Sequence, residues 1–397
     1  MKVLVISHMY PSTISDIYGV FVHQQVKELV VQGCEVKVIS PIPLASFPLN
    51  KIKKKWQKYS MVPNKAVIDG IEVYYPRYVE FPGGFLFEHS GFLMYLGIKN
   101  IIKQIYKEFK FDLIHSHVAL PDGFAGMLVN KDYNLPHIVT VHGQDLQATI
   151  YKNSRCKANL FRVFNKADKV TVVSNKLKKV IANEKFAYKV EVIYNGINPE
   201  ELAITSQGKK NTSEKFILSV SSLIDIKGID LNIRAFNMLV KKYPTLKYYI
   251  IGEGYYRNYL EKLVKELKLE NNIKFLGRLT YQETMHYMSC ASIFSLPSWE
   301  EGFGVVYIEA MAHGTPVIGV QGEGIGDVII NGINGFLVKP KNIESIVDAM
   351  EFLINNPDEA SLIGNNGRST VLNNYTWEIN VAKTKSLYNY LLENYKK

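Results

Sequence analysis

Two glutamates lie in a glycine-containing turn whose residue types suit the binding of a small polar molecule. Seven residues separate Glu301 from Glu309, and Gly302 and Gly304 follow the first glutamate. An apolar strand precedes this turn, and a helix is expected to begin near Val305. Glycines leave backbone N–H groups uncovered, and a helix N-terminus adds free amides with partial positive charge. The turn therefore predicts a site where amides bind phosphate or hydroxyl oxygens and carboxylates accept hydrogen bonds from hydroxyl groups.

Two further residues have types and positions that suit chemistry. Lys227 lies at the start of a predicted helix, where the helix dipole disfavours a cation, so an anionic partner is indicated. His142 follows an apolar strand, and a histidine in that position alone is more often structural. The pair Gly252 and Gly254 lacks the third glycine of a dinucleotide fingerprint, because Arg257 stands in that place.

Residues 297–317 resemble the signature of family 4 of the retaining glycosyltransferases, which have the GT-B fold. The signature sets two glutamates seven residues apart in a Pro-Ser…Glu-Gly-Phe-Gly frame, followed by Glu-Ala-Met-Ala-x-Gly-x-Pro-Val. Residues 223–228 resemble the family's basic loop for the donor phosphates. Residues 140–143 resemble the loop whose histidine lies near the donor sugar, and residues 112–123 also match. The first loop, with Gly-Val-Phe at 19–21, resembles members that build surface polysaccharides, including those of teichuronic acid assembly.

The resemblance implies a retaining hexosyltransferase that takes a nucleoside diphosphate sugar, with UDP favoured over GDP. The acceptor would be a glycan or a lipid-linked molecule in cell-surface polysaccharide synthesis. The catalytic residues implied are His142, Lys227 and Glu301. The donor-binding residues implied are Gly19, Ser222, Lys227, Arg278, Glu301, Gly302, Phe303, Gly304 and Glu309. His117 and Asp122 are implied on the acceptor side. No cofactor or metal is expected, since the sequence has no Asp-x-Asp motif.

One departure from the family pattern leaves other functions open. Many members carry Gly-Arg-Leu where this chain has Ser221-Ser222-Leu223, so a planar bidentate donor to the diphosphate is absent. Lys227 remains, and Arg278 or the amides of residues 302–304 are candidates to compensate. A catalytically silent subunit that binds sugar nucleotides or glycans is one alternative. A GT-B sugar-nucleotide epimerase is another.

Short apolar runs alternate with amphipathic segments, which predicts an α/β fold with parallel sheets. Strands are expected at 3–6, 35–40, 71–75, 113–115, 138–141, 169–173, 190–193, 216–220, 247–251, 273–275, 291–295 and 316–319. Helices are expected at 20–31 and 91–109. A polar boundary at 195–214 predicts two Rossmann-like domains: an acceptor-binding domain at 1–200 with the terminal helix 378–397, and a nucleotide-sugar-binding domain at 215–377. Ligands in such sheets lie beyond the carboxyl ends of the strands.

The formal net charge of +10 over 397 residues suggests an anionic partner. Nucleic acid is disfavoured, because it would leave the glutamate pair unexplained. Five lysines surround Trp56 between residues 51 and 58. This segment is either a solvated loop or a contact with anionic lipid headgroups that places Trp56 at the interface. No apolar stretch reaches the roughly 18 residues of a spanning helix, and the three cysteines lack disulfide or zinc spacing. A cytoplasmic protein, peripheral on the inner face of the cell membrane, is expected.

Overall fold

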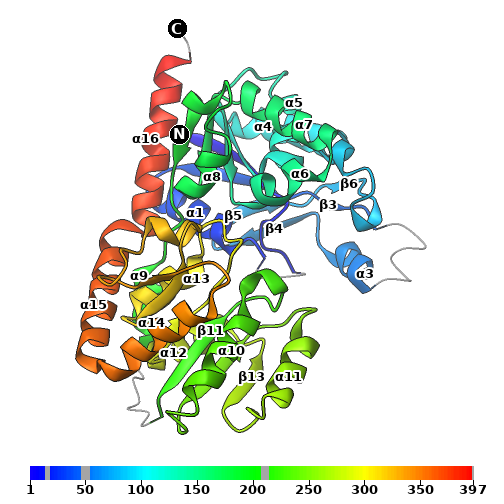
Figure 1. Cartoon of the computed structure of the whole chain (residues 1–397). Helices are drawn as coiled ribbons and strands as arrows, with labels where there is room; N and C mark the ends of the chain where they lie inside the picture. Colours follow the sequence, from blue (N-terminus) through cyan, green and yellow to red (C-terminus); the bar gives the residue numbers. More distant parts are fainter. Residues whose placement is uncertain (14–17, 46–53, 207–213, 396–397) are drawn as a thin grey trace. The chain divides into compact units, whose positions relative to one another are not determined.

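The computed structural model describes residues 1–13, 18–45, 54–206 and 214–395 (Figure 1). The chain divides into two compact units. Met1–Tyr194 and Trp377–Lys397 form the first unit, and Asn195–Thr376 form the second. Helix α9 (Pro199–Ser206) therefore belongs to the second unit, whereas the sequence placed residues 195–200 in the first domain. The described part of the chain contains no helix that is both long and apolar enough to cross a bilayer.

A single sheet forms the centre of the first unit, with the strand order β10-β9-β8-β7-β1-β2-β5-β4. Its strands are β1 (Lys2–Ile6), β2 (Glu35–Ile39), β4 (Lys65–Ile68), β5 (Ile71–Tyr74), β7 (Leu113–His117), β8 (His137–Val141), β9 (Lys169–Val172) and β10 (Val190–Val192). Neighbouring strands are parallel except β4 and β5, which are antiparallel. Asp69 and Gly70 join these two strands with positive φ angles of 48° and 79°, the geometry of a tight hairpin turn. The expected parallel sheet thus has one antiparallel edge strand that the sequence analysis missed.

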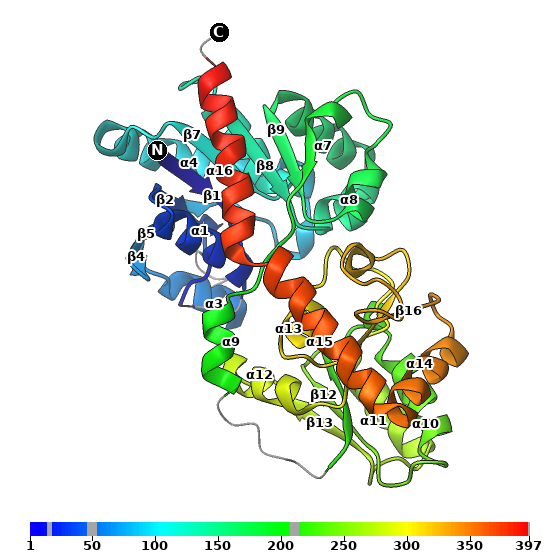
Figure 2. The ribbon, with the colours of Figure 1, turned by 90° about the vertical axis from the view of Figure 1, so that its left-hand side faces the viewer.

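Helices cover the first sheet, and the last helix returns to this unit from the end of the chain. The helices of the first unit include α1 (Val20–Val31), α4 (Ser90–Phe109), α5 (Phe124–Val129), α6 (Ile150–Lys152), α7 (Ser154–Lys166), α8 (Asn175–Val180) and α16 (Trp377–Asn394). Figure 2 shows α16 running beside α1 and β1. Gln25 Nε2 on α1 donates a 2.6 Å hydrogen bond to Asn380 Oδ1 on α16. The terminal helix that was expected to cross back to the N-terminal domain is confirmed.

Three short elements on either side of the expected strand and its hairpin were not predicted. Strands β3 (Ile42–Pro43) and β6 (Arg77–Tyr78) pair with each other, and α3 (Lys54–Met61) lies between them in the sequence. Trp56 is 6% exposed and packs edge-on against Tyr59, with ring centroids 6.0 Å apart. An interfacial role for Trp56 is therefore wrong, because a buried indole cannot reach lipid. Residues 51–53 lie outside the described part of the chain.

The second unit is built on a fully parallel sheet in the order β13-β12-β11-β14-β15-β16. Its strands are β11 (Phe216–Val220), β12 (Lys247–Ile251), β13 (Ile273–Gly277), β14 (Ile293–Ser295), β15 (Val317–Val320) and β16 (Phe336–Val338). Its longer helices are α10 (Ile229–Leu239), α11 (Arg257–Glu266), α12 (Tyr281–Cys290), α13 (Val305–Ala312), α14 (Ile343–Asn355) and α15 (Pro357–Asn374). From β11 the chain proceeds toward one edge of the sheet, and from β14 toward the other edge. The strand order therefore reverses between β11 and β14, and α/β sheets bind ligands at such a point.

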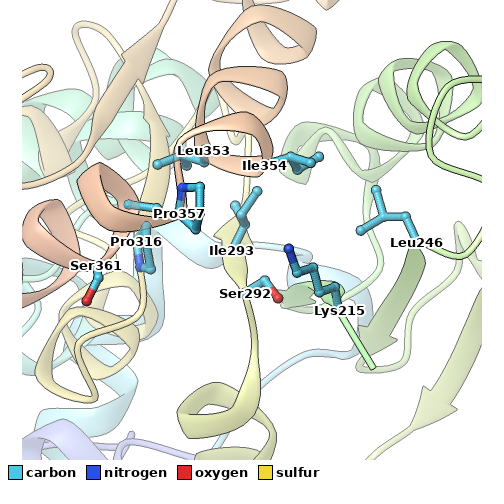
Figure 3. A pocket seen from close by; sticks show the side chains of 10 residues that line it. Lys215, Leu246, Ser292, Ile293, Pro316, Leu353, Ile354, Pro357 and Ser361 are labelled. Carbon is cyan, nitrogen blue, oxygen red and sulfur yellow. The ribbon is translucent and has the colours of Figure 1, made fainter. Parts of the chain in front are cut away.

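A cavity of about 220 Å³ lies at the amino ends of the strands in the second unit. Its lining includes Lys215 just before β11, Ser292 and Ile293 at the start of β14, and Pro316 before β15. Figure 3 shows these side chains together with those of the end of α14 and the start of α15. Because the candidate residues follow the carboxyl ends of the strands, this cavity is not part of the predicted site.

Gly254 provides a test of how tightly the loops at the carboxyl edge of the second sheet pack. A Cβ atom at this position would lie 2.1 Å from the carbonyl oxygen of Leu223. The same carbonyl accepts a 3.0 Å hydrogen bond from the Tyr256 N–H, so it cannot move freely. We expect Gly254→Ala to lower the free energy of unfolding by about 1–3 kcal/mol, the usual cost of overpacking, in urea denaturation.

The matched control is Gly326→Ala. A Cβ atom there meets nothing within 4 Å, and the backbone φ is not in the left-handed region. We expect this variant to be as stable as the native chain or slightly more stable, because alanine restricts the unfolded chain. Equal losses in the two variants would show that crowding against Leu223 is not what selects glycine at position 254.

Candidate functional site

The reversal point of the second sheet brings two predicted loops into contact. The loop after β11 carries Lys227, and the loop after β14 carries Glu301. Ile226 joins them, since its carbonyl accepts hydrogen bonds from the Trp299 N–H at 3.1 Å and from Ser298 Oγ at 3.2 Å. These contacts hold Lys227 against the turn that follows β14.

Gly228 is needed where these two loops approach each other. Its φ is +67°, and a Cβ atom would lie 2.4 Å from the carbonyl oxygen of Pro297. Gly228 also begins α10, so the lysine before it stands at the N-terminus of that helix. The predicted position of Lys227 at the start of a helix is therefore confirmed.

Lys227 and Glu301 form an ion pair in the second unit. Their Nζ and Oε2 atoms are 2.6 Å apart, and the two side chains are only 18% and 16% exposed. The backbone N–H of Glu301 donates a 2.6 Å hydrogen bond to Glu323 Oε2, which fixes the turn from its other side. Gly304, with φ of 89°, begins α13 without a side-chain cap. The turn thus combines a cation, a carboxylate and the N-terminus of a helix.

Glu309 lies on α13, one turn beyond the helix start, and is partly buried. Burial raises its pKa to about 7, and the negative charge of Glu201 acts in the same direction. Tyr281 lies at the start of α12. Burial raises the pKa of its hydroxyl, and the nearby charges of Glu309 and Glu201 raise it further. Glu309 is therefore poised to gain or lose a proton near neutral pH. The sequence analysis missed Tyr281 and Glu323, because nothing in their local patterns distinguishes them.

Three predicted donor-binding residues do not join this cluster through their side chains. Phe303 is 2% exposed and lies beside Tyr375, with ring centroids 6.2 Å apart, so only its backbone is left for a ligand. Ser222 is exposed after β11. Arg278 follows the edge strand β13, two strands from β11 and hence about 10 Å away at the backbone. Among the described residues, no hydrogen bond or ion pair connects Arg278 with Lys227 or Glu301.

The first sheet reverses its order between β1 and β7, and a histidine–aspartate pair lies at that point. The His8 N–H donates to Asp122 Oδ1 at 2.9 Å, and His8 Nδ1 lies 2.5 Å from Asp122 Oδ2. Asp122 is completely buried, whereas the His8 side chain is 26% exposed. Asp122 was predicted on the acceptor side, but its side chain has no exposed surface. Its hydrogen-bond partner His8 is the member of the pair that reaches solvent. His8 was missed, although its position directly after the first strand was a usable signal.

The charges in this pair differ from those of free side chains. Burial alone would lower the pKa of His8, but the charge and hydrogen bonds of Asp122 outweigh it and raise the pKa. Burial raises the pKa of Asp122 in spite of its histidine partner. Nearby Asp145 accepts hydrogen bonds from the backbone N–H groups of Ala119 at 2.8 Å and Leu120 at 3.3 Å. It thereby ties the loop after β8 to the loop after β7, and its burial raises its pKa to about 7.

His117 and His142 lie together at the ends of β7 and β8. His117 Nδ1 and His142 Nε2 are 3.0 Å apart, and the rings stack with centroids 5.3 Å apart. Burial lowers the pKa of His142 to about 3, so the ring is neutral at pH 7. Within the described chain, His142 Nδ1 and His117 Nε2 are buried without a hydrogen-bond partner. Since an unpaired buried polar atom is costly, these nitrogens indicate a place for a ligand that forms hydrogen bonds.

Gly19 closes the first loop of the first unit. It begins α1 with φ of 72°, and a Cβ atom would lie 1.5 Å from the carbonyl oxygen of Met9. No other residue fits there without moving the loop. Residues 14–17 of this loop lie outside the described part of the chain. In the described ranges, no group of three or more His, Cys, Asp or Glu side chains is arranged to hold a metal ion.

Comparisons with known proteins identify the family and the fold of this chain. The family model described as Glycosyltransferase Family 4 matches residues 19–201, and the model for glycosyl transferases group 1 matches residues 201–370. An uncharacterised glycosyltransferase of Methanocaldococcus jannaschii is 33% identical over 72% of this chain and 77% of its own. The putative teichuronic acid biosynthesis glycosyltransferase TuaC of Bacillus subtilis is 28% identical over 88% of each chain. The crystal structure of Anabaena HepE in complex with UDP and glucose has a TM-score of 0.72 and 17% identity, covering 98% of this chain and 100% of its own.

Proposed function

Because the chain belongs to glycosyltransferase family 4, with two α/β units of the GT-B type, we propose that it transfers a hexose from a UDP-sugar with retention of anomeric configuration. The acceptor is a glycan or a lipid-linked molecule of a cell-surface polysaccharide. The single observation that carries the proposal is the partly buried Lys227–Glu301 ion pair in the turn that leads into α13. The UDP bound by HepE supports the choice of donor, and the similarity to TuaC, a putative teichuronic acid biosynthesis glycosyltransferase, supports the pathway.

In the proposed reaction, the second unit stabilises the leaving nucleoside diphosphate. Cleavage of the sugar–phosphate bond builds negative charge on the phosphate oxygens, which Lys227 and the amides of Gly302–Gly304 offset. Glu301 holds Lys227 in place and orients the sugar, and Glu309 accepts hydrogen bonds from the ribose hydroxyls. His142 binds a sugar hydroxyl through its unpaired Nδ1.

The first unit offers no suitable carboxylate for a covalent intermediate among the candidate residues. Asp122 and Asp145 are 0% and 1% exposed and are already hydrogen-bonded within their loops. We therefore propose attack on the face from which the phosphate departs. The acceptor oxygen forms the new bond to the anomeric carbon, the sugar–phosphate bond breaks, and the leaving phosphate takes the acceptor proton. No metal or cofactor is required by this scheme.

We also propose that the reaction takes place in the cytoplasm, at the inner face of the cell membrane. The free thiols Cys34, Cys156 and Cys290 suit a reducing compartment, and a lipid-linked acceptor would be presented at that surface. Lipid contact was one of the two interpretations of the segment 51–58, the other being a solvated loop. Of its lysines, Lys58 is the one whose exposed side chain the structure describes.

The donor site can be tested by thermal shift with a panel of UDP- and GDP-sugars. We expect one UDP-sugar to raise the melting temperature of the native chain, because a ligand at about 100 times its Kd stabilises by about 2.7 kcal/mol. Glu309→Ala should lose most of that shift, since it removes the acceptor for the ribose hydroxyls.

The control for this experiment is Glu270→Ala, which removes an exposed glutamate from the same unit. It should keep the full shift. If no nucleotide sugar stabilises the native chain, or if the two alanine variants respond equally, the second unit does not bind its donor as proposed. A shift in melting temperature with GDP-sugars alone would show that the donor carries guanine and not uracil, and the proposed binding site would stand.

A further inference from the structure

Large apolar side chains are concentrated on the surface of one segment of the first unit, residues 79–96, which we call the apolar patch. Its exposed members have exposures between 36% and 67%. They are Val79, Phe81, Phe85, Leu86, Phe92 and Leu96. Phe92 and Leu96 are four residues apart on α4 and so share one helix face. Val79, Phe81, Phe85 and Leu86 line one shallow hollow, and exposed apolar residues grouped in this way mark an interaction surface.

The backbone holds the apolar patch in this exposed arrangement. Leu86 has φ of 52°, a left-handed conformation that is unfavourable for a bulky residue. Lys152 Nζ donates to the Gly84 carbonyl at 3.3 Å, and Asn159 Nδ2 donates to the Glu88 carbonyl at 2.7 Å. The segment is thus anchored on α6 and α7, and its phenylalanines are presented on a supported loop.

Basic side chains lie on the helices that support the apolar patch, and Lys152 and Arg155 contact its segment directly. Residues 150–166, which span α6 and α7, contain five basic residues and no acidic ones. The basic residues are Lys152, Arg155, Lys157, Arg162 and Lys166. On α4, the exposed face that begins with Phe92 and Leu96 continues with Lys99, Lys103 and Lys107.

The two acidic residues of the apolar patch are both engaged locally. Glu88 lies 3.7 Å from Arg155 and its side chain is 13% exposed. Glu80 accepts a hydrogen bond from the Tyr78 hydroxyl. The basic rim therefore keeps most of its positive charge available to an external partner.

The chemistry of this surface distinguishes among possible occupants. The hollow between Phe81, Phe85, Phe87 and Leu93 measures about 20 Å³, which is enough for a water molecule and too little for a sugar or an acyl chain. A second copy of the chain would bring the same positive rim against itself, and lysine is depleted from stable interfaces. An anionic bilayer matches both features, since aromatic side chains enter the headgroup region while lysine and arginine meet the lipid phosphates.

We propose that the first unit docks on anionic phospholipid bilayers through the apolar patch and its basic rim on α4, α6 and α7. This surface differs from the segment 51–58 that the sequence suggested, where Trp56 is buried. The inference deepens the proposed location at the inner face of the membrane by naming the surface that meets the lipid, and it requires neither donor nor acceptor. Its failure would leave the donor experiment above unaffected.

Co-sedimentation of the full chain with vesicles tests the proposal. We expect binding to mixed phosphatidylcholine–phosphatidylglycerol vesicles, weak binding to phosphatidylcholine alone, and release as salt is raised. The double variant Phe85→Asp/Phe92→Asp should bind the mixed vesicles at least about tenfold more weakly, because both rings leave the interface and two negative charges enter it. Lys152→Glu/Lys157→Glu should weaken binding similarly.

Matched controls separate the surface from general effects of charge and folding. Tyr188→Asp alters a 79% exposed aromatic residue elsewhere in the first unit. Lys241→Glu/Lys265→Glu makes the same charge change as the lysine double variant, on exposed positions of the second unit. Both should bind like the native chain, and all variants should keep the donor-induced thermal shift. The proposal is overturned if the native chain ignores anionic vesicles, if the phenylalanine variant binds as well as the native chain, or if that variant instead abolishes self-association seen by light scattering.

Discussion

Lys227→Ala is expected to reduce the rate of sugar transfer by about 10²–10³-fold, as does the removal of one donor to a developing oxyanion in other enzymes. Lys227 is held 2.6 Å from Glu301 by a loop whose approach to Pro297 admits only glycine at position 228. The ammonium group is thus positioned before the donor binds, and no reorganisation is needed as charge develops on the diphosphate. Removing it also leaves Glu301 without its cation, which adds repulsion toward the phosphates.

The measurement is the initial rate of nucleoside diphosphate release, with the donor identified by thermal shift. The loss should appear mainly in kcat, because the interaction strengthens in the transition state. Lys215→Ala, which removes an exposed lysine at the opposite edge of the same sheet, should leave the rate unchanged. If Lys227→Ala retains a rate within a few-fold of the native chain while still binding donor, another group must neutralise the leaving phosphate.

Much of the scaffold of the site could be predicted from the sequence. The strands at 216–220 and 247–251 and the helix at 20–31 have the bounds that the apolar spacing indicated. These segments are buried on one or both sides, so their composition reports their environment directly. The helix start at Val305 was also predicted correctly, because glycines and a change of periodicity mark it.

The features that were missed depend on contacts between distant segments. The pair His8–Asp122 joins residues 114 positions apart, and neither residue has a local pattern that reveals its partner. The five lysines around Trp56 left a solvated loop and a lipid contact as alternatives, and neither foresaw that tertiary packing buries the indole. Strand β4 escaped notice although Asp69-Gly70 is a strong hairpin signal, since the prolines before it suggested an irregular segment.

The order of the strands is a further quantity that no local pattern could supply. Composition alone does not tell which strands are neighbours, and the reversal points between β11 and β14 and between β1 and β7 appear only in the folded sheets. Those points explain why Lys227 meets Glu301 and why His8 meets Asp122. Arg278 is a cation and lies beyond the carboxyl end of its strand, as a phosphate-binding residue should. Its strand β13 is two places from β11 in the sheet, so it does not reach Lys227.

Asp122→Asn is expected to lower the free energy of unfolding by about 3–5 kcal/mol near pH 6, the cost of breaking a buried ion pair by removing one partner. Both oxygens of Asp122 accept hydrogen bonds from His8, and the carboxylate is fully buried. Because folding raises the pKa of His8, the charged histidine stabilises the folded chain fully below pH 6.5, its ordinary pKa. This stabilisation is lost as the pH rises through the pKa of His8 in the folded chain. The raised pKa of Asp122 acts with the same sign, because the folded chain holds its proton more tightly than the unfolded chain does.

Urea unfolding of the native chain and the variant at pH 6 and pH 9 measures this effect. The difference between them should be largest at pH 6 and smaller at pH 9, because His8 loses its charge as the pH rises through its raised folded pKa. Asp69→Asn is the matched control, because Asp69 also pairs with a histidine, His23 Nε2 at 3.0 Å, but is 53% exposed. Solvent screens that pair, so its loss should cost less than about 1 kcal/mol. The two variants could instead lose equal free energies of unfolding, or the effect of Asp122→Asn could be independent of pH. Either result would mean that Asp122 stabilises its loop by hydrogen bonding alone and that His8 carries no charge in the folded chain.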